Sequence, residues 1–157
     1  MNGAPDERTG ALAAAAGLRV ILLAMAGGVA MLAVFVLVTY RRGPAAPLDA
    51  RAFATLRVFS LLDLLLSLSC WTTSAFLFKS LSAPRTPAAY QTASVARAAL
   101  REGPALLGLI ACFLGASSGA LRVQPAYWAN ALPAAAFVGW VLASLPDESS
   151  VRQALEP

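Results

Sequence analysis

The chain has 157 residues, of which 59% are hydrophobic and only 13% are charged, and its net charge is +4. Soluble domains carry about 25% charged residues, so this composition excludes an ordinary soluble domain and predicts an integral membrane protein. The basic residues lie at the ends of apolar runs, where arginine anchors a helix to lipid headgroups, and this placement argues against a nucleic-acid partner.

Four apolar runs, each long enough to cross a bilayer, follow one another along the chain. They cover residues 20–40, 58–78, 103–121 and 127–145. A helix rises about 1.5 Å per residue and the hydrocarbon core is about 30 Å thick, so about 20 apolar residues span it. The sequence therefore predicts an all-α fold with a single membrane domain over residues 1–157. In it, four helices form a bundle of two antiparallel hairpins.

The first run ends at Arg41 and Arg42 without a small-residue cleavage site, so we interpret it as a retained span and not as a signal peptide. The tails and the connection over 79–102 hold seven basic residues, against five on the opposite side, which favours cytoplasmic termini. Lys79 is the only lysine, and the dominance of arginine and alanine indicates a GC-rich bacterial genome. The expected location is the bacterial cytoplasmic (inner) membrane.

The second run carries polar residues at three- and four-residue steps, which places them along one helix face. These residues are Ser60, Asp63, Ser67, Cys70 and Ser74. A polar stripe facing lipid is unfavourable, so it should face the interior or a partner. It serves either as a polar pathway or as a source of hydrogen bonds between helices. In a hairpin, Asp63 would lie opposite Thr39, Tyr40 and Arg41 at the end of the first span.

The connection over 79–102 predicts a short interfacial helix before the third span. Thr86-Pro87 has the form of an N-cap followed by proline at the first helical position, and residues 88–101 have helical composition. This segment should lie at the interface or extend the third span. Because proline lacks a backbone N–H, we expect a kink or restart at Pro104 and a kink at Pro133.

Glu102 would then lie beside the positive end of the restarted helix, within reach of Arg97 or Arg101. An ion pair there would keep the carboxylate charged and give it a structural role. The alternative is a functional carboxyl group that exchanges a proton or a cation, which is the default hypothesis for an ionisable residue inside a span.

Small residues at four-residue spacing let helices approach closely in lipid. The third span offers two such ladders, which include Gly108, Gly115 and Gly119, and the fourth offers Ala135 and Gly139. The first span adds Ala24 and Gly28. The sequence therefore predicts that the third and fourth spans form the tightest helix pair.

From Tyr90 the chain reads Tyr-Gln-Thr-Ala-Ser, then Arg97, then Ala-Leu-Arg-Glu-Gly-Pro-Ala-Leu up to Leu106. This segment resembles one in small uncharacterised bacterial membrane proteins with four predicted spans, where it heads the third span. The matching positions are Tyr90, Thr92, Ala93, Ser94, Arg97, Ala99, Leu100, Glu102, Gly103, Pro104, Ala105 and Leu106. The resemblance implies the four-span architecture and no particular activity.

The stretch from Glu102 to Ala111 is also similar to the ion-carrying segment of rotary ATPase proteolipid subunits. In those subunits a glutamate is followed by proline or leucine and then by a Gly-Leu pair, which Gly108 and Leu109 match. The likeness implies that Glu102 carries an ion. Three features depart from the proteolipid pattern: Glu102 heads its span, Arg101 adjoins it, and the first span has only Gly27-Gly28 where proteolipids carry an extended glycine ladder.

Reactive side chains are few. The chain has no histidine, and its two cysteines, Cys70 and Cys112, stand apart inside apolar runs. Zinc, haem and thiol-redox sites, and the common hydrolase triads, need histidine or paired cysteines. We therefore expect no metal, no cofactor and no enzymatic activity. The leading hypothesis is a structural or accessory subunit that packs in the lipid bilayer as a homo-oligomer or within a larger complex. The alternative is an oligomeric unit that translocates an ion or small solute through Glu102 or Asp63.

Overall fold

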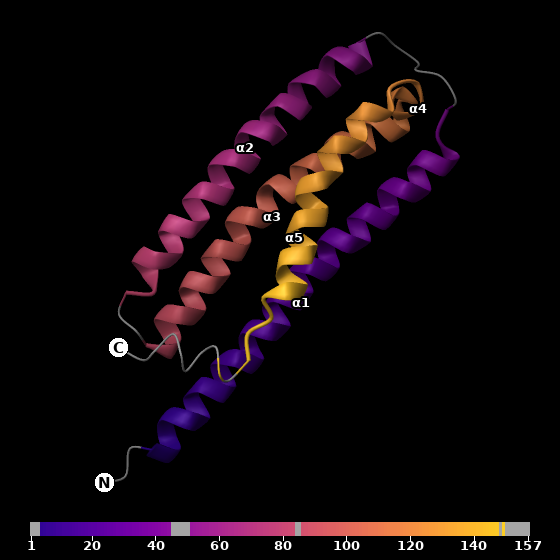
Figure 1. Cartoon of the computed structure of the whole chain (residues 1–157). Helices are drawn as coiled ribbons and strands as arrows, with labels where there is room; N and C mark the ends of the chain where they lie inside the picture. Colours follow the sequence, from indigo (N-terminus) through magenta and orange to yellow (C-terminus); the bar gives the residue numbers. More distant parts are fainter. Residues whose placement is uncertain (1–3, 45–50, 84–85, 148, 150–157) are drawn as a thin grey trace.

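The computed structural model describes residues 4–44, 51–83, 86–147 and 149, and every regular element in them is a helix (Figure 1). The elements are α1 (Ala4–Arg42), α2 (Arg51–Leu81), α3 (Pro87–Ser117), α4 (Ala120–Val123), the 3-10 helix η1 (Pro125–Ala131) and α5 (Leu132–Ala143). Four segments are long and apolar enough to cross a membrane, and the fourth of them combines η1 with α5. The all-helical fold and the four long apolar helices are as predicted.

The prediction of a separate interfacial helix before the third span is wrong, because α3 is one helix from Pro87 to Ser117. Thr86 is its N-cap, as expected, and its hydroxyl oxygen accepts the Ala89 N–H at 3.2 Å. Pro104 lies buried inside the helix, which continues on both sides of it. Alanine and arginine extend a helix as well as leucine does, so the helix begins well before the apolar run.

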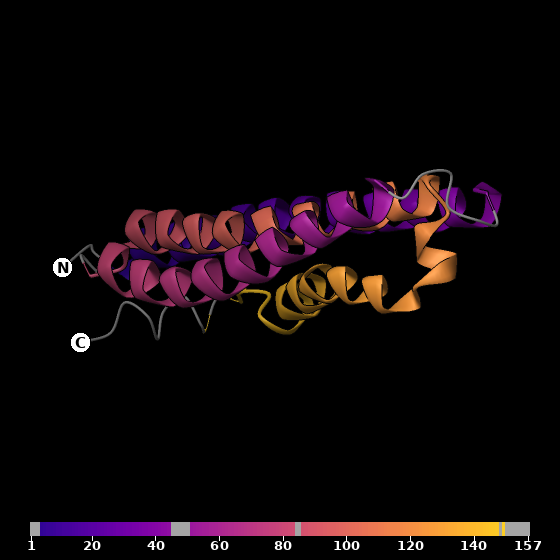
Figure 2. The same ribbon diagram turned by 90° about the horizontal axis from the view of Figure 1, so that it is seen from above.

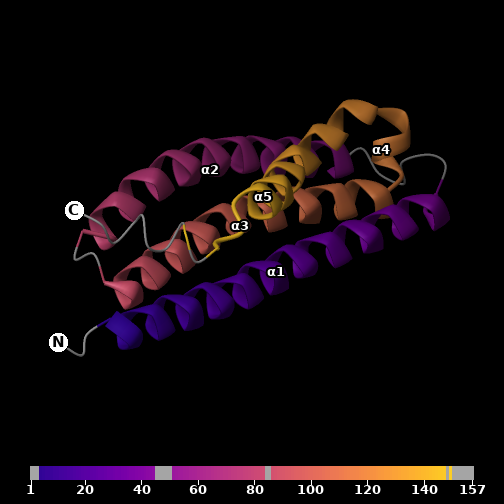
Figure 3. The same cartoon turned by 60° about the horizontal axis from the view of Figure 1, so that its bottom comes forward.

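α3 is also the central helix of the fold. It contacts α2 most extensively, then α1 and α5, whereas α1 and α2 barely touch (Figures 1 and 3). In the most apolar 18-residue stretch of α3, 50% of the residues are buried, whereas in the corresponding stretch of α2 only 11% are buried. Consecutive long helices run antiparallel, but α3 lies between the first two. The predicted packing of the first and second spans as a hairpin is therefore wrong.

η1 and α5 lie on one side of the other three long helices (Figure 2). The bulky side chains of α5 that face inward are Phe137 and Val141, both fully buried. Ala135 and Gly139 are exposed, and a Cβ atom at Gly139 would meet nothing within 4 Å. The predicted third–fourth pair through small residues is therefore wrong, since large side chains fill that contact. Pro133 lies in the first turn of α5, where its fixed φ suits a helix start.

The two glycines of the G-x-x-x-G pattern do not pack against the fourth span as predicted. A Cβ atom at Gly115 would lie 2.9 Å from Cγ of Leu121 in α4 and 3.4 Å from Cδ1 of Leu56 in α2. The missing side chain of Gly115 therefore lets α2 and α4 pack closely against α3. Gly119 has φ 76°, a left-handed conformation that glycine adopts without strain, and it separates α3 from α4. The G-x-x-x-G pattern thus marks one helix contact and one turn.

Two arginines tie distant segments to α1. Arg122 of α4 donates from Nη2 to the backbone oxygens of Tyr40 at 2.6 Å and Arg41 at 3.1 Å, which satisfies carbonyls at the C-terminal end of α1. Arg19 of α1 donates from Nε to the Pro146 carbonyl, which holds the chain just after α5. These contacts fix both ends of the η1–α5 segment against the first helix.

The outer surface of the helices is apolar. On α2 the exposed large side chains are Val58, Leu61, Leu62, Leu64, Leu65, Leu66, Leu68 and Phe76. The buried polar or charged residues are instead Asp63, Ser74, Ser94, Arg101 and Asn130. The core itself is apolar, so a continuous outer surface of large aliphatic side chains is the feature that departs from a soluble protein.

Candidate polar sites along the central helix

The polar stripe of α2 lies against α3 and η1, which is the inward orientation that its spacing predicts. The Ser60 hydroxyl oxygen accepts from Asn130 Nδ2 at 2.9 Å, and the Ser74 hydroxyl oxygen accepts from Arg101 Nε at 3.0 Å. Each of these hydroxyls donates its own hydrogen to the backbone, to Leu56 and Trp71 respectively. The stripe therefore supplies hydrogen-bond acceptors to neighbouring helices.

Arg101 occupies what we call the arginine clamp, formed by Arg101, Ser74, Trp71 and Trp140. Its side chain is 5% exposed, and its Cζ atom lies 4.2 Å from the Trp71 ring centroid and 4.4 Å from that of Trp140. Aromatic faces attract a guanidinium by their negative quadrupole, and more strongly where water is excluded. The clamp joins three helices, α2, α3 and α5, around one charge.

Glu102 forms no ion pair with Arg97 or Arg101 within the described part of the chain. Residues next to each other on a helix point in different directions, and Arg101 is turned toward the two tryptophans. Since α3 does not restart at Pro104, Glu102 is not at a helix end either. Its side chain is partly exposed. The expected ion pair of Glu102 is therefore absent from these residues.

Asp63 is 3% exposed and lies where α2 meets α3 and η1. Its Oδ1 atom has no hydrogen-bond partner among the described residues, and neither has the hydroxyl of Ser67 one turn along. A Cβ atom at Gly108 would lie 3.0 Å from Asp63 Oδ2 and 2.0 Å from the backbone oxygen of Asn130. The glycine thus lets a carboxyl group and a carbonyl oxygen converge, an arrangement that suits a shared proton or a cation.

The partners expected for Asp63 at the end of the first span lie elsewhere. Tyr40 packs edge-to-face on Trp128 at 5.3 Å, and its backbone oxygen, like that of Arg41, accepts from Arg122. The Thr39 hydroxyl donates to the Phe35 carbonyl one turn back. Because α3 separates α1 from α2, the hairpin geometry behind that expectation does not apply.

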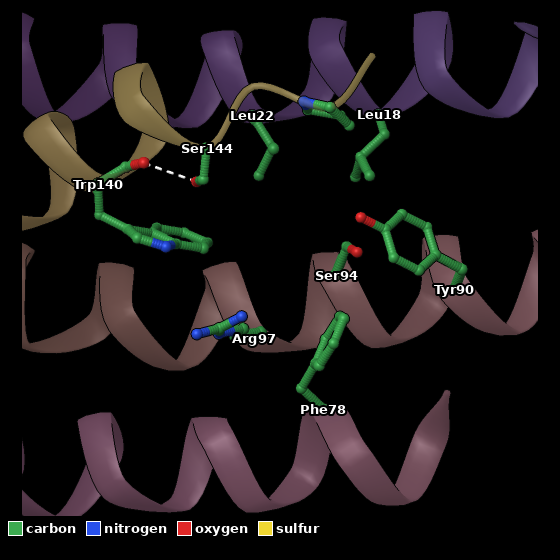
Figure 4. A pocket seen from close by; sticks show the side chains of 9 residues that line it. Leu18, Leu22, Phe78, Tyr90, Ser94, Arg97, Trp140 and Ser144 are labelled. Atoms are coloured by element: carbon green, nitrogen blue, oxygen red, sulfur yellow. Dashed lines mark hydrogen bonds between the residues drawn. The ribbon is translucent and has the colours of Figure 1, made fainter. Parts of the chain in front are cut away.

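Arg97 and Tyr90 border a cavity of about 80 Å³ between α1, α2, α3 and α5 (Figure 4). Arg97 Cζ lies 5.1 Å from the Phe78 ring centroid and 5.4 Å from that of Trp140, and its buried Nε has no hydrogen-bond partner among the described residues. The lining consists of Leu18, Leu22, Phe78, Tyr90, Ser94, Arg97, Trp140, Ser144 and Pro146.

The structure brings two of the predicted candidates, Tyr90 and Arg97, to one cavity and separates Glu102 and Asp63 from it. Two residues complete the clamp and the cavity: Trp140, which lies in α5, and Ser144, which is the C-cap of α5. Their sequence signal was weak, because single tryptophans and serines occur at many helix positions. Cys112 is buried and its thiol lies 3.8 Å from the Tyr127 carbonyl oxygen.

The chain matches no protein-family model, no curated protein and no solved structure. The two resemblances, to small four-span bacterial membrane proteins and to rotary ATPase proteolipids, stay hypotheses. Among the described residues no group of three or more histidine, cysteine, aspartate and glutamate side chains could hold a metal ion.

Proposed function

We propose that the chain is a multi-pass protein of the bacterial cytoplasmic membrane, with cytoplasmic termini and no catalytic role, that packs through its outer helix faces against a partner in the bilayer. The partner is a second copy of the chain or another membrane protein. The observation that carries this proposal is the outward orientation of the small-residue ladders on α1 and α5.

Membrane insertion is supported by the distribution of polarity. An exposed surface of leucine, valine and phenylalanine on α2 would drive aggregation in water but is the surface that hydrocarbon solvates. The polar stripe of the same helix makes its hydrogen bonds to α3 and η1, away from that surface. A bilayer is compatible with both faces of α2, because lipid contacts the apolar face and the polar face is turned away from lipid.

Partner packing is supported by the exposed ladders. Ala24 and Gly28 on α1, and Ala135, Gly139 and Ala143 on α5, are all exposed. A Cβ atom at Gly28 or Gly139 would meet nothing within 4 Å. Small-x-x-x-small faces let helix backbones approach closely in lipid, and the fold itself leaves these faces unused.

Matched pairs of substitutions test the proposal. Ala135→Leu and Gly28→Leu place bulk on the ladders, whereas Ala136→Leu and Ala30→Leu place the same kind of bulk on neighbouring exposed positions. Native mass spectrometry of the gently solubilised protein should show a complex for the wild type and for the two controls, and dissociation for the ladder variants. A wild type that is monomeric with nothing attached contradicts partner packing.

Orientation is tested separately by cysteine accessibility in a variant whose two native cysteines are replaced. Cysteine at Ala83 should react only from the cytoplasmic side, and cysteine at Ala46 only from the outside. The reverse labelling pattern would place the termini outside. Equal access from both sides at either position would contradict a four-span insertion.

A second function, ion translocation, is favoured by the buried and unpartnered Asp63 Oδ1. Ionisable groups inside spans commonly mark proton or ion pathways. In liposomes with a pH-sensitive dye, the wild type would then conduct protons, Asp63→Asn would abolish conduction and Glu102→Gln would retain it. Conduction that is absent, or unchanged in Asp63→Asn, removes this candidate and leaves the packing role.

A further inference from the structure

The cavity beside Arg97 holds an excess of positive charge. Arg97 and Arg101 lie one turn apart on α3, and both guanidinium groups lie over the ring of Trp140, at 5.4 Å and 4.4 Å. Among the described residues, no carboxylate belongs to the cavity lining. Two partly or fully buried cations without a counter-charge are costly, and an anion in the cavity would offset that cost.

The two arginines are not equivalent. Arg101 is held in the clamp by two aromatic faces and the Ser74 hydroxyl. Arg97 has aromatic contacts but no hydrogen-bond acceptor for its buried Nε within the described residues. Guanidinium groups bind phosphate and carboxylate oxygens through paired N–H donors. Within the described part of the chain, Arg97 is therefore the cation of the pair that lacks a hydrogen-bond acceptor, and Figure 4 shows its side chain at the cavity.

The remaining polar groups of the lining select among anions. Tyr90, Ser94 and Ser144 add three hydroxyl groups, each of which can donate to an oxygen. The Ser144 hydroxyl already donates to the Trp140 carbonyl at 2.6 Å, which leaves Tyr90 and Ser94 as the donors. A carboxylate has two oxygens, whereas a terminal phosphate has three or four and can engage Arg97 and both hydroxyls together.

The size and the position of the cavity agree with a phosphate group as its ligand. A volume of about 80 Å³ has room for about five or six non-hydrogen atoms, which is the size of a phosphate group. Leu18 and Leu22 supply an aliphatic wall beside the polar groups. Most lining residues lie near the C-terminal ends of α2 and α5 or in the N-terminal part of α3. These helix ends lie toward the end of the molecule where α1 begins (Figure 1), the level at which headgroups would lie if the helices cross a membrane.

We propose that this cavity binds a terminal phosphate group, a phosphate monoester, with Arg97 as the charged ligand and Tyr90 and Ser94 as hydroxyl donors. The group belongs either to a lipid headgroup or to a soluble phosphate ester. The site is separate from the outward ladders of the proposed partner surface. All three of these ligands lie on α3, and side chains of α1, α2 and α5 form the walls around the anion.

The test measures binding to the full chain in neutral detergent by native mass spectrometry. The lipid probe is phosphatidate, and its control is a diacylglycerol with the same acyl chains and no phosphate. Phosphatidate should be retained and diacylglycerol lost. Glycerol 3-phosphate then separates the two sources: efficient competition indicates a site for soluble phosphate esters, and its failure indicates a lipid site.

Variants assign the site. Arg97→Gln should weaken phosphatidate binding by about 10-fold or more, the loss expected for a charge-assisted hydrogen bond. Arg57→Gln removes the same charge from an exposed position on α2 and should change binding less than about 2-fold. Tyr90→Phe and Ser94→Ala should each give smaller losses. Equal retention of phosphatidate and diacylglycerol by the wild type, or equal effects of Arg97→Gln and Arg57→Gln, overturns the proposal.

Discussion

Two charged residues are buried along the contact between α2 and α3, and their surroundings differ. Arg101, 5% exposed, lies between two tryptophan rings and donates to Ser74. Asp63, 3% exposed, has an oxygen without any partner among the described residues and faces the Asn130 carbonyl near Gly108. The cation therefore has a hydrogen-bond acceptor and two aromatic faces, whereas one oxygen of the carboxyl group has no hydrogen-bond partner among the described residues.

The chemistry of serine in a helix explains this difference. Ser60 and Ser74 donate their hydroxyl hydrogens to backbone carbonyls of the preceding turn, so only their oxygen lone pairs face the neighbouring helices. These two serines accept hydrogen bonds from asparagine and arginine and offer no donor to a carboxylate, whereas the Ser67 hydroxyl, one turn from Asp63, has no partner among the described residues. A serine that donates its hydrogen to its own helix therefore stabilises a neighbouring positive charge more readily than a negative one.

The largest effect is expected for Gly108→Ala, which disturbs the Asp63 region. The added methyl group would lie 2.0 Å from the Asn130 backbone oxygen, so η1 must move. We expect the free energy of unfolding in detergent to fall by about 3 kcal/mol, because a backbone oxygen and not a flexible side chain has to give way. Gly139→Ala, where nothing lies within 4 Å, should leave stability unchanged or raise it by up to about 1 kcal/mol. Similar losses in both variants would contradict the packing at Gly108.

Arg101→Ala should have the next largest effect. It removes two cation–π contacts and a charge-assisted hydrogen bond, partly offset by the relief of burying a charge, and we expect a loss of about 2 kcal/mol. Arg101→Met keeps an apolar chain between the tryptophans and should cost about half as much. Thermal denaturation in detergent measures both. A stable Arg101→Ala protein would show that the clamp contributes nothing to the fold.

Asp63→Asn should have the opposite sign. The amide keeps the shape of the carboxyl group, carries no charge, and brings an N–H donor next to the Asn130 carbonyl. We expect an increase in stability of about 1 kcal/mol. Ser67→Ala, which removes the other unpartnered polar atom of the same face, provides a neutral reference. A clear loss of stability in Asp63→Asn would mean that the carboxylate binds a cation or a donor that stabilises the fold.

Glu102→Gln should have the smallest effect, less than about 0.5 kcal/mol, because Glu102 has no ion pair within the described residues and is partly exposed. Carbodiimide labelling gives an independent measurement, since these reagents modify protonated carboxyl groups in apolar surroundings. We expect Glu102 to resist labelling at neutral pH. Rapid labelling that depends on pH would transfer the ion-carrying role from Asp63 to Glu102.

The sequence predicted the fold to the extent that local chemistry decides it. Four apolar runs of span length predicted four long helices, and Thr86-Pro87 predicted the start of α3. The steps between Ser60 and Ser74 predicted one inward polar face. These features depend on residues close together in the chain, so periodicity and capping rules apply to them.

Features that depend on which helices meet were predicted poorly. The order of the helices suggested a pairing of the first two spans, and Gly139 suggested close packing against the third. Neither holds, because α3 lies between α1 and α2 and because Phe137 and Val141 fill the α5 contact. A ladder of small residues shows that a close approach is possible but does not say to which helix. Trp71 and Trp140 become recognisable as partners of Arg101 only once three helices are assembled.

The central position of α3 has a consequence for biogenesis. A protein is synthesised from its N-terminus, so α1 and α2 leave the ribosome before the helix that they both pack against. Since α1 and α2 barely contact one another, they cannot form a stable pair while they wait. The fold therefore assembles only after the third helix has been synthesised. The carbonyls at the C-terminal end of α1 accept their hydrogen bonds later still, because Arg122 follows α3 in the chain. Truncated chains that end before Pro87 should be recognised as incomplete and degraded.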